Sequence, residues 1–521
     1  MKNITRLCSS ISLEMPSPRP HLRSPFLFVT VAMLLLLLST ASSTFAGSAT
    51  WRANPSSGDW NTAANWTPMT VPNGPDDTAT FATSNQTHVS ISAVTEVNGI
   101  VFNSGASSFT ILPEDLPSAD LEIVGTGIVN NSGIVQKFRI TNGLFSGMIV
   151  FRNSATAGER SSFTNSPGYT IFLDSSNAGN SRFINNAATL PNTAFGETEF
   201  QDSSRAGNGT FINTGAAVAD ADPGHVLFCC TSTAANAKLI ASSGQGAGMG
   251  GQIIFDNDSD GGTARAEVFG NGNLDITFHT QPGVTVGSIE GDGDIFLGAM
   301  NLTVGSNNLS TNFSGVIQDG GQNGGTGGSL TKIGTGKLVL SHRNTYTGGT
   351  IIKRGSLMVN NIGGSGTGSG PVQVNGGTLG GKGIIAGAVT VGTGTGSGAI
   401  LSPGYQRGAN KLGALTIESP LTFNADATYN VEVNSSTVTA DEVIANGVTI
   451  NSGAQFSFAD IGSATLAIGT VFTVINNTSA TPIAGTFSNL PDGSMFTVNG
   501  NTYQVNYDGG DGNDLTLTVV P

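Results

Sequence analysis

Residues Ser329–Val359 read SLTKIGTGKLVLSHRNTYTGGTIIKRGSLMV and decide the fold of this 521-residue chain. Leu338 and Leu340 alternate with their neighbours at the period of two that marks a β-strand. Further short apolar runs follow at 351–352 and 357–359, and turns rich in Gly and Asn separate the runs. We therefore expect three short strands, and a spacing of this kind suits stacked rungs, that is, a parallel β-helix.

The same stretch resembles the autotransporter passenger-associated repeat. The chain differs at His342-Arg343, where the family usually has a small residue or Gly before its Asn. The positions that match the repeat are Leu330, Lys332, Gly334, Gly336, Leu338, Leu340, Asn344, Thr345, Tyr346, Gly348, Thr350, Gly355, Leu357 and Val359. The resemblance implies an all-β protein built as a right-handed parallel β-helix (solenoid), of the kind found in surface and secreted proteins of bacteria.

Many proteins with this repeat end in a translocator barrel, which would need about twelve strands and roughly 250 residues. Here about a hundred residues follow the last recognisable repeat segment, and the chain ends in Val519-Val520-Pro521. We therefore expect that the chain lacks the usual C-terminal translocator and depends on separate export machinery.

The composition favours a long solenoid with uncharged outer faces. Gly accounts for 73 residues, and only 11% of residues are charged, less than half of the usual share of about 25%. Apolar residues recur at strand spacing throughout, which argues against disorder. The formal net charge of −14 argues against nucleic-acid binding.

The N-terminus reads as a secretory signal, residues 1–46. Basic residues precede an apolar run from Phe26 to Leu38, which is too short to span a bilayer. Thr44-Phe45-Ala46 offers small residues at the positions that signal peptidase reads, so we predict cleavage after Ala46. The alternative is an uncleaved anchor. In the mature chain no segment is expected to span a membrane, and the protein is expected to be secreted or held at the cell surface.

Residues 47–145 are predicted to form an N-terminal cap module. All three tryptophans, Trp51, Trp60 and Trp66, lie here among turn residues. They could stack on sugars, or they could fill the open end of the β-helix, since an uncovered terminal rung exposes apolar core and unpaired backbone groups. We favour the cap.

Residues 146–270 carry an internal repeat in which a small residue follows a Phe by seven positions. One copy per rung, with Phe stacked on Phe inside the coil, explains both the aromatic residue and the period of 21 to 28 residues. The five pairs are Phe151/Gly158, Phe172/Gly179, Phe200/Gly207, Phe228/Ala235 and Phe255/Gly262. Residues 271–419 are predicted to continue the β-helix with Gly-rich turns, and 420–521 to form a C-terminal β-module.

Motifs for catalysis are sparse. After signal removal four His remain, at 88, 225, 279 and 342, in dissimilar contexts, and neither a Gly-x-Ser-x-Gly elbow nor a His-Glu-x-x-His helix is present. No catalytic or cofactor-binding residue is predicted, and no cofactor. A carboxylate pair assembled from distant rungs, as a polysaccharide lyase or hydrolase would use, cannot be recognised in a sequence.

One pattern could bind calcium. Residues 256–267 fit Asp-x-Asp-x-Asp-Gly-x₅-Glu, with Asp256, Asp258, Asp260 and Glu267 as candidate ligands. The flanks read as strands rather than as the two helices of an EF-hand, and the segment is the fifth copy of the Phe-to-Gly repeat. An acidic solvent-facing turn is the preferred interpretation, and no metal site is predicted.

These observations favour an exported, non-enzymatic β-helical protein with a structural or adhesive, adhesin-like role. Its partner would be an extracellular polysaccharide or a cell-surface component. The rival hypothesis is a carbohydrate-active enzyme, a lyase or hydrolase on a pectin lyase-like β-helix.

Overall fold

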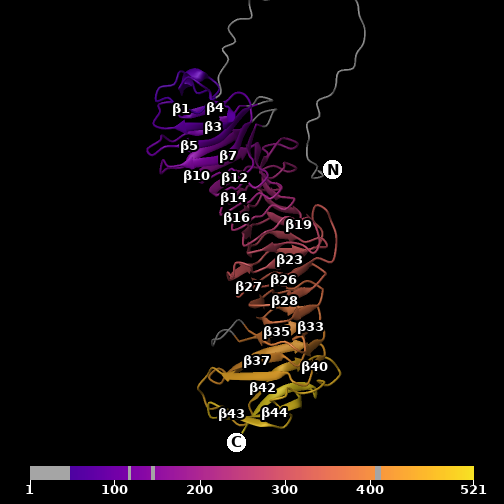
Figure 1. Ribbon diagram of the computed structural model, residues 1–521. Coiled ribbons are helices and arrows are strands. Elements are labelled where there is room, and N and C mark those ends of the chain that lie inside the picture. The colour runs from indigo at the N-terminus through magenta and orange to yellow at the C-terminus, as the bar shows by residue number, and fades with distance from the viewer. Residues whose placement is uncertain (1–46, 115–118, 142–146, 405–411) are drawn as a thin grey trace, which may run out of the picture.

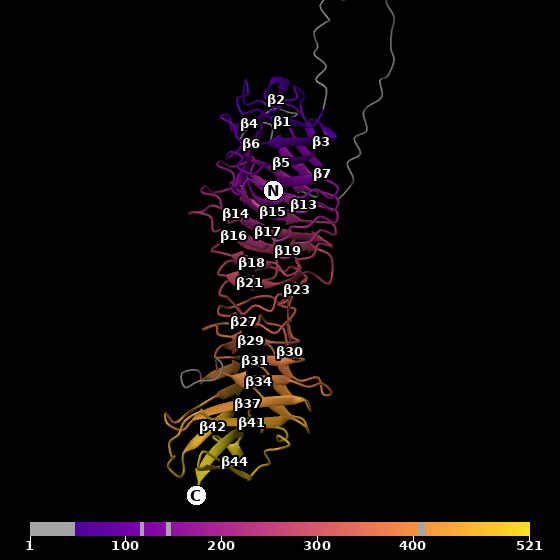
Figure 2. The same ribbon diagram turned by 60° about the vertical axis from the view of Figure 1, so that its left-hand side comes forward.

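The described part of the chain forms a rod, with its N-terminal region at one end and its C-terminal region at the other (Figures 1 and 2). The computed structural model describes residues 47–114, 119–141, 147–404 and 412–521. The predicted signal segment 1–46 lies outside the described residues. Within them the only helix is the three-residue 3-10 turn η1 (Ala63–Asn65). The predicted all-β class is confirmed.

Four hydrogen-bonded sheets run along the rod, and their strands are mostly parallel. Sheet I contains, in spatial order, β2 (Trp66–Thr67), β1 (Ala49–Trp51), β3 (Gly74–Phe81), β5 (Thr95–Phe102), β7 (Leu121–Asn130), β9 (Met148–Phe151), β11 (Gly168–Phe172), β13 (Gly196–Phe200), β15 (His225–Phe228), β17 (Gln252–Asn257), β19 (Asn273–His279), β22 (Asp294–Phe296) and β25 (Val316–Gln318).

Sheet II follows a second side of the rod. Its ladder contains β4 (His88–Ile91), β6 (Thr110–Pro113), β8 (Gln136–Thr141), β10 (Glu159–Ser166), β12 (Asn180–Asn185), β14 (Thr210–Asn213), β16 (Lys238–Ala241), β18 (Arg265–Val268), β21 (Ser288–Gly291), β24 (Thr311–Phe313), β27 (Lys337–Leu340), β29 (Ser356–Val359), β31 (Gly377–Gly381), β34 (Ala399–Pro403), β37 (Ala427–Asn434) and β41 (Gln455–Asp460), with β38 (Thr439–Ala440) antiparallel to β37.

The third side is a full sheet only from residue 285 onwards. Sheet III contains β20 (Thr285–Val286), β23 (Asn301–Val304), β26 (Ser329–Lys332), β28 (Thr350–Ile352), β30 (Val372–Val374), β33 (Val389–Val391), β36 (Leu421–Phe423) and β40 (Val448–Ile450). Before it, single parallel bridges link Thr156, Asn177, Arg205, Thr233 and Asp260 in turn. The chain thus coils around three sides, which confirms the predicted parallel β-helix.

Sheet IV closes the C-terminal end of the rod. It contains β32 (Ile384–Ile385), β35 (Ala414–Ile417), β39 (Glu442–Ala445), β42 (Val471–Asn477), β45 (Asp514–Val520), β44 (Asn501–Gly509) and β43 (Met495–Val498). The first four strands are parallel and the last three join antiparallel. The coil therefore ends in a meander.

Two columns of phenylalanine fill the interior between residues 138 and 255. Phe151, Phe172, Phe200, Phe228 and Phe255 stack with ring centroids 4.7 to 5.0 Å apart. Phe138, Phe163, Phe183 and Phe211 form the second column, at 4.7 to 4.8 Å. These distances equal the spacing of neighbouring strands, so each ring lies one rung above the last. The sequence repeat is therefore the rung.

The small residue of each repeat copy occupies a left-handed backbone position. Gly158, Gly179, Gly207 and Gly262 have φ between +56° and +74°, and Ala235 has +49°. Glycine adopts this region without steric cost, whereas a Cβ disfavours it. A Cβ on Gly179 would also lie 2.4 Å from the carbonyl oxygen of Gly158. The positive φ and the nearby backbone explain why a Gly or Ala occupies this position in every copy.

Residues 329–359, the stretch that resembles the passenger-associated repeat, contain four strands rather than the three predicted. Ser329–Lys332 forms β26, before β27, β28 and β29. The Thr331 and Lys332 side chains are buried, so the segment lacks the alternation that would have marked a strand. On the side of sheet I, the side chain of Asn344 makes the contact that a further strand would make. Its Oδ1 accepts the backbone N–H of Ile317, in β25, at 2.7 Å.

The tryptophans fill the N-terminal end of the rod. Trp51, Trp60 and Trp66 are at most 2% exposed, and all three lie within 6.0 Å of the Phe81 ring, centroid to centroid. Each indole N–H donates to a backbone carbonyl. Buried rings cannot stack on a sugar, so these residues close the core.

Candidate functional site

Lys332 matches one of the fixed positions of the repeat, and its ammonium contacts the backbone of the coil. Its ammonium donates to the carbonyl oxygens of Ile333, Gly334 and Arg354, the last at 3.4 Å and from the following rung. Burial lowers the pKa of Lys332 to about 8. The ammonium satisfies carbonyl groups inside a turn, where water has little access. The repeat residues thus hold rungs together.

Tyr346 also serves packing. It is fully buried, and its hydroxyl forms a hydrogen bond with the Thr350 hydroxyl at 2.5 Å. Burial raises the pKa of Tyr346 above its ordinary value, which keeps the hydroxyl protonated at neutral pH.

The four calcium candidates do not form one cluster. Glu267 lies in β18 on sheet II, paired in register with Ile240, and its carboxylate contacts Lys238 at 3.0 Å and Arg265 at 3.2 Å. Asp260 lies on the third side, bridged to Thr233.

Asp256 and Asp258 have other partners. The Asn257 N–H donates to Asp256 at 2.7 Å, and the Thr280 hydroxyl donates to Asp258. Burial raises the pKa of Asp256 above its ordinary value, and the bond from Asn257 offsets part of this. Among the described residues, no group of three or more His, Cys, Asp or Glu side chains is arranged to hold a metal ion.

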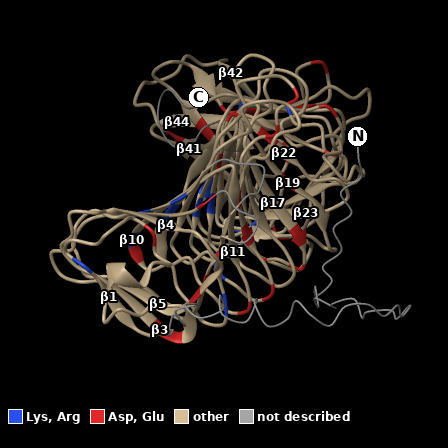
Figure 3. Ribbon diagram, turned by 90° about the horizontal axis from the view of Figure 1, so that it is seen from above, with Lys and Arg blue, Asp and Glu red and all other residues tan. Residues whose placement is uncertain are grey.

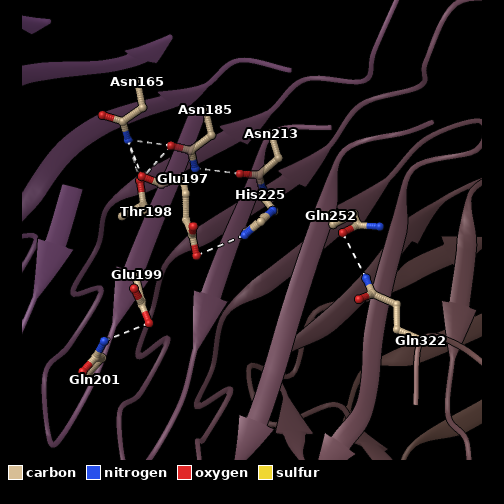
Figure 4. Close-up of polar contacts among 10 residues, drawn as sticks. All are labelled: Asn165, Asn185, Glu197, Thr198, Glu199, Gln201, Asn213, His225, Gln252 and Gln322. Carbon is tan, nitrogen blue, oxygen red and sulfur yellow. Dashed lines mark hydrogen bonds and ion pairs between the residues drawn. The ribbon is translucent and has the colours of Figure 1, made fainter. Parts of the chain in front are cut away.

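Inside the rod, an amide ladder runs from rung to rung along one position of β10, β12 and β14. The Asn165 side chain donates to Asn185, and Asn185 donates to Asn213, both at 2.8 Å (Figure 4). Thr198 donates to Asn185 at 2.9 Å. All four residues are buried, so this polar network is satisfied internally and fixes the register of the strands.

A strip of polar side chains covers the outer face of sheet I. His225 Nε2 lies 3.0 Å from a Glu197 carboxylate oxygen, and the two side chains are 14% and 9% exposed (Figure 4). The Phe195 ring covers His225 at 4.7 Å. Burial lowers the pKa of His225, but the charge of Glu197, the hydrogen bond to it, and the charges of Glu199 and Asp222 together leave the pKa raised. This pair is shielded from solvent and serves packing.

Further along the strip, a loop returns to sheet I. The Gln322 side chain donates to Gln252 (Figure 4), and the Gln322 N–H donates to Asp275 at 2.9 Å. The Gly-rich segment 320–328 is thus a loop packed on the rod, consistent with the predicted Gly-rich turns of this region.

One pocket brings two carboxylates together. It opens on the outer face of sheet II, with a volume of about 550 Å³, inside the range of small-molecule sites. Most of its lining projects outward from successive rungs. The lining residues are Ser356, Met358, Thr378, Ile400, Ser402, Pro403, Thr428, Asn430, Glu432, Asp441 and Ser457.

The two acids of this pocket lie at its C-terminal end. Glu432 is 5% exposed and Asp441 2%. Burial raises the pKa of Asp441 to about 7, while hydrogen bonds from the Gly413 and Glu432 N–H groups and the charge of Lys382 act in the opposite direction. A carboxyl with a pKa near 7 can donate a proton at neutral pH.

The sequence did not single out this pair. The alternation of 429–433 put Glu432 on the outer face of a strand, but nothing indicated that the β37–β38 hairpin returns Asp441 beside it.

Cys229 is not arranged as a reactive thiol. The Sγ atoms of Cys229 and Cys230 lie 3.3 Å apart, beyond the ~2.0 Å of a disulfide bond, so these neighbours do not bridge each other. Burial raises the pKa of Cys229 to about 12, which disfavours a thiolate.

Acidic residues outnumber basic ones along the rod and occur on several of its sides (Figure 3). In the described ranges, no helix combines the length and apolar character needed to cross a membrane.

The rod and its repeat define a parallel β-helix that carries an autotransporter passenger repeat. Residues 330–359 match the Passenger-associated-transport-repeat family. A segment of 169 residues is 28% identical to an extracellular serine protease of Serratia marcescens, covering 31% of this chain and 14% of that protein.

Among solved structures, the Haemophilus influenzae Hap adhesin aligns with a TM-score of 0.29 and 9% identity, over 85% of this chain and 64% of that chain. The matches span less than two thirds of either relative.

Proposed function

We propose that the chain is an exported passenger-type rod that acts outside the cell as a structural or adhesive protein, without enzymatic activity. The observation that carries the proposal is the transport repeat at 330–359, built into the middle of a continuous β-helix. A rod of stacked rungs presents long faces while each rung contacts only its neighbours, which suits display of a surface. Its partner would be an extracellular polysaccharide or a cell-surface component.

Two features support the non-enzymatic part. His225 and Glu197 are shielded by Phe195, and the acids at 256–267 are spread over three sides of the rod. The conspicuous polar groups therefore stabilise the coil.

The pocket containing Glu432 and Asp441 favours a second candidate, a carbohydrate-active enzyme. A neutral carboxyl beside a second carboxylate is the pair that glycoside hydrolysis uses. The test is incubation of the exported chain with a panel of neutral and acidic polysaccharides, followed by measurement of new reducing ends and unsaturated products. We expect no turnover. Turnover that disappears in Glu432→Gln and in Asp441→Asn would replace the first proposal with the second.

A further inference from the structure

Five basic side chains project from one outer face of sheet II, in the N-terminal half of the rod. In register, the first row reads Lys137, Ser162, Arg182, Thr210, Lys238 and Arg265 along β8, β10, β12, β14, β16 and β18. The second row, two residues further along each strand, reads Arg139, Thr164, Ile184, Ile212, Ile240 and Glu267. We call Lys137, Arg139, Arg182, Lys238 and Arg265 the basic face.

The basic face stands out against the rest of the chain. The protein has 21 Lys and Arg against 35 Asp and Glu, yet these five cations share the outer surface of six successive strands. Glu267 and Glu290 pair with Lys238 and Arg265 at 3.0 to 3.2 Å. Lys137, Arg139 and Arg182 are exposed and make no ion pair among the described residues. Uncompensated positive charge therefore lies toward β8 and β12.

The shape of the face restricts the ligand. Six strands at roughly 4.8 Å spacing extend over about 24 Å, so the cations form a line. Ile184, Ile212 and Ile240 run beside that line and remain partly exposed. An extended chain with regularly spaced anionic groups and less polar ring faces fits both rows.

We propose that the basic face binds an anionic polysaccharide laid along the rod. The cations would contact its carboxylate or sulfate groups, and the isoleucine row would contact the C–H faces of its sugar rings. The inference rests on the proposed function in one respect, that the rod meets extracellular glycans. Single-stranded nucleic acid fits less well, because neither row offers an aromatic side chain on which its bases could stack.

The test measures binding of the full exported chain to heparin, which is sulfated, and to polygalacturonate, which carries only carboxylates. Dextran serves as the neutral control, and random-sequence duplex DNA as the competing polyanion. The variant is Lys137→Gln, Arg139→Gln, Arg182→Gln. A matched triple variant, Arg343→Gln, Lys353→Gln, Arg354→Gln, removes the same charge from exposed positions elsewhere. Equal melting temperatures of the three proteins establish that each is folded.

We expect the wild type to bind at least one acidic glycan, with affinity that falls steeply with salt. The basic-face variant should bind roughly tenfold more weakly, or worse, while the matched variant should bind as the wild type does. Comparing the affinity for heparin with the affinity for polygalacturonate shows whether the basic face prefers sulfate or carboxylate groups. No binding to either glycan, equal loss in both variants, or DNA binding as tight as glycan binding would each overturn the inference. Polysaccharide turnover in the earlier assay would overturn the non-enzymatic proposal but would not affect this one.

Discussion

The ammonium of Lys332 lies 3.4 Å from the backbone carbonyl oxygen of Arg354, one rung further along the coil. The same ammonium also contacts the carbonyl oxygens of Ile333 and Gly334. One side chain therefore ties together two turns of the transport repeat. This contact gives a physical reason for a lysine at that position.

We expect Lys332→Met to lower the free energy of unfolding by about 1–3 kcal/mol, because buried carbonyl groups would lose their donor. Lys353→Met, at an exposed position, is the control and should change it little. Chemical denaturation measures both. Equal stability of the two variants would mean that the ammonium contributes nothing to the coil.

Leu340→Asp should destabilise the chain by about 3–5 kcal/mol, since the residue is fully buried in a rung and an unpaired charge would enter the core. Ile351→Asp makes a comparable change at a side chain that is 37% exposed, and should cost far less. Melting curves compare them. If Ile351→Asp proved the more damaging, the assignment of inward and outward faces would be wrong.

Gly179→Ala should destabilise by about 1–3 kcal/mol, because the added Cβ would meet a neighbouring backbone and φ is +63°. Ala235→Gly, at the equivalent position with φ +49°, should instead stabilise by up to about 1 kcal/mol. We therefore expect Gly179→Ala to lower the melting temperature and Ala235→Gly to raise it. Destabilisation by Ala235→Gly would refute the strain argument.

The stability of the protein should depend on the titration of Asp441. Burial raises its folded-state pKa from 3.8 to about 7. A raised pKa means that the folded state binds the proton more tightly, so this contribution is fully present below about pH 4 and is lost as pH rises through 7. At about 1.4 kcal/mol per pKa unit, the loss over the whole window should be about 4 kcal/mol.

Asp441→Asn cannot titrate, so its unfolding free energy should fall less than that of the wild type between pH 5 and pH 8. Asp508→Asn, at an exposed position, should retain the wild-type slope. Identical slopes in all three proteins would show that Asp441 is ionised throughout this range.

Sequence reasoning succeeded where one residue type repeats on every rung. Phe151, Phe172 and Phe200 marked both the period and the inward face, and the stacked rings confirm the coil. It missed β26, because buried Lys332 and Thr331 interrupt the polar alternation.

Sites on a solenoid are harder to predict. Glu432 and Asp441 meet through a hairpin, and Lys137 and Arg182 share a row only because the strands align in register. These contacts depend on loop lengths and register, which periodicity does not specify. The Asp256–Glu267 motif shows the reverse, since its residues are regularly spaced in the sequence but lie on three different sides of the rod.

The central claim is that the rod is displayed outside the cell. Its most direct test is immunodetection of the chain in the culture medium and on intact cells, before and after adding a protease that cannot enter them. We predict that the chain is found in the medium, or is removed from intact cells by the protease. A chain that is absent from the medium and fully protected until the cells are lysed would contradict the claim.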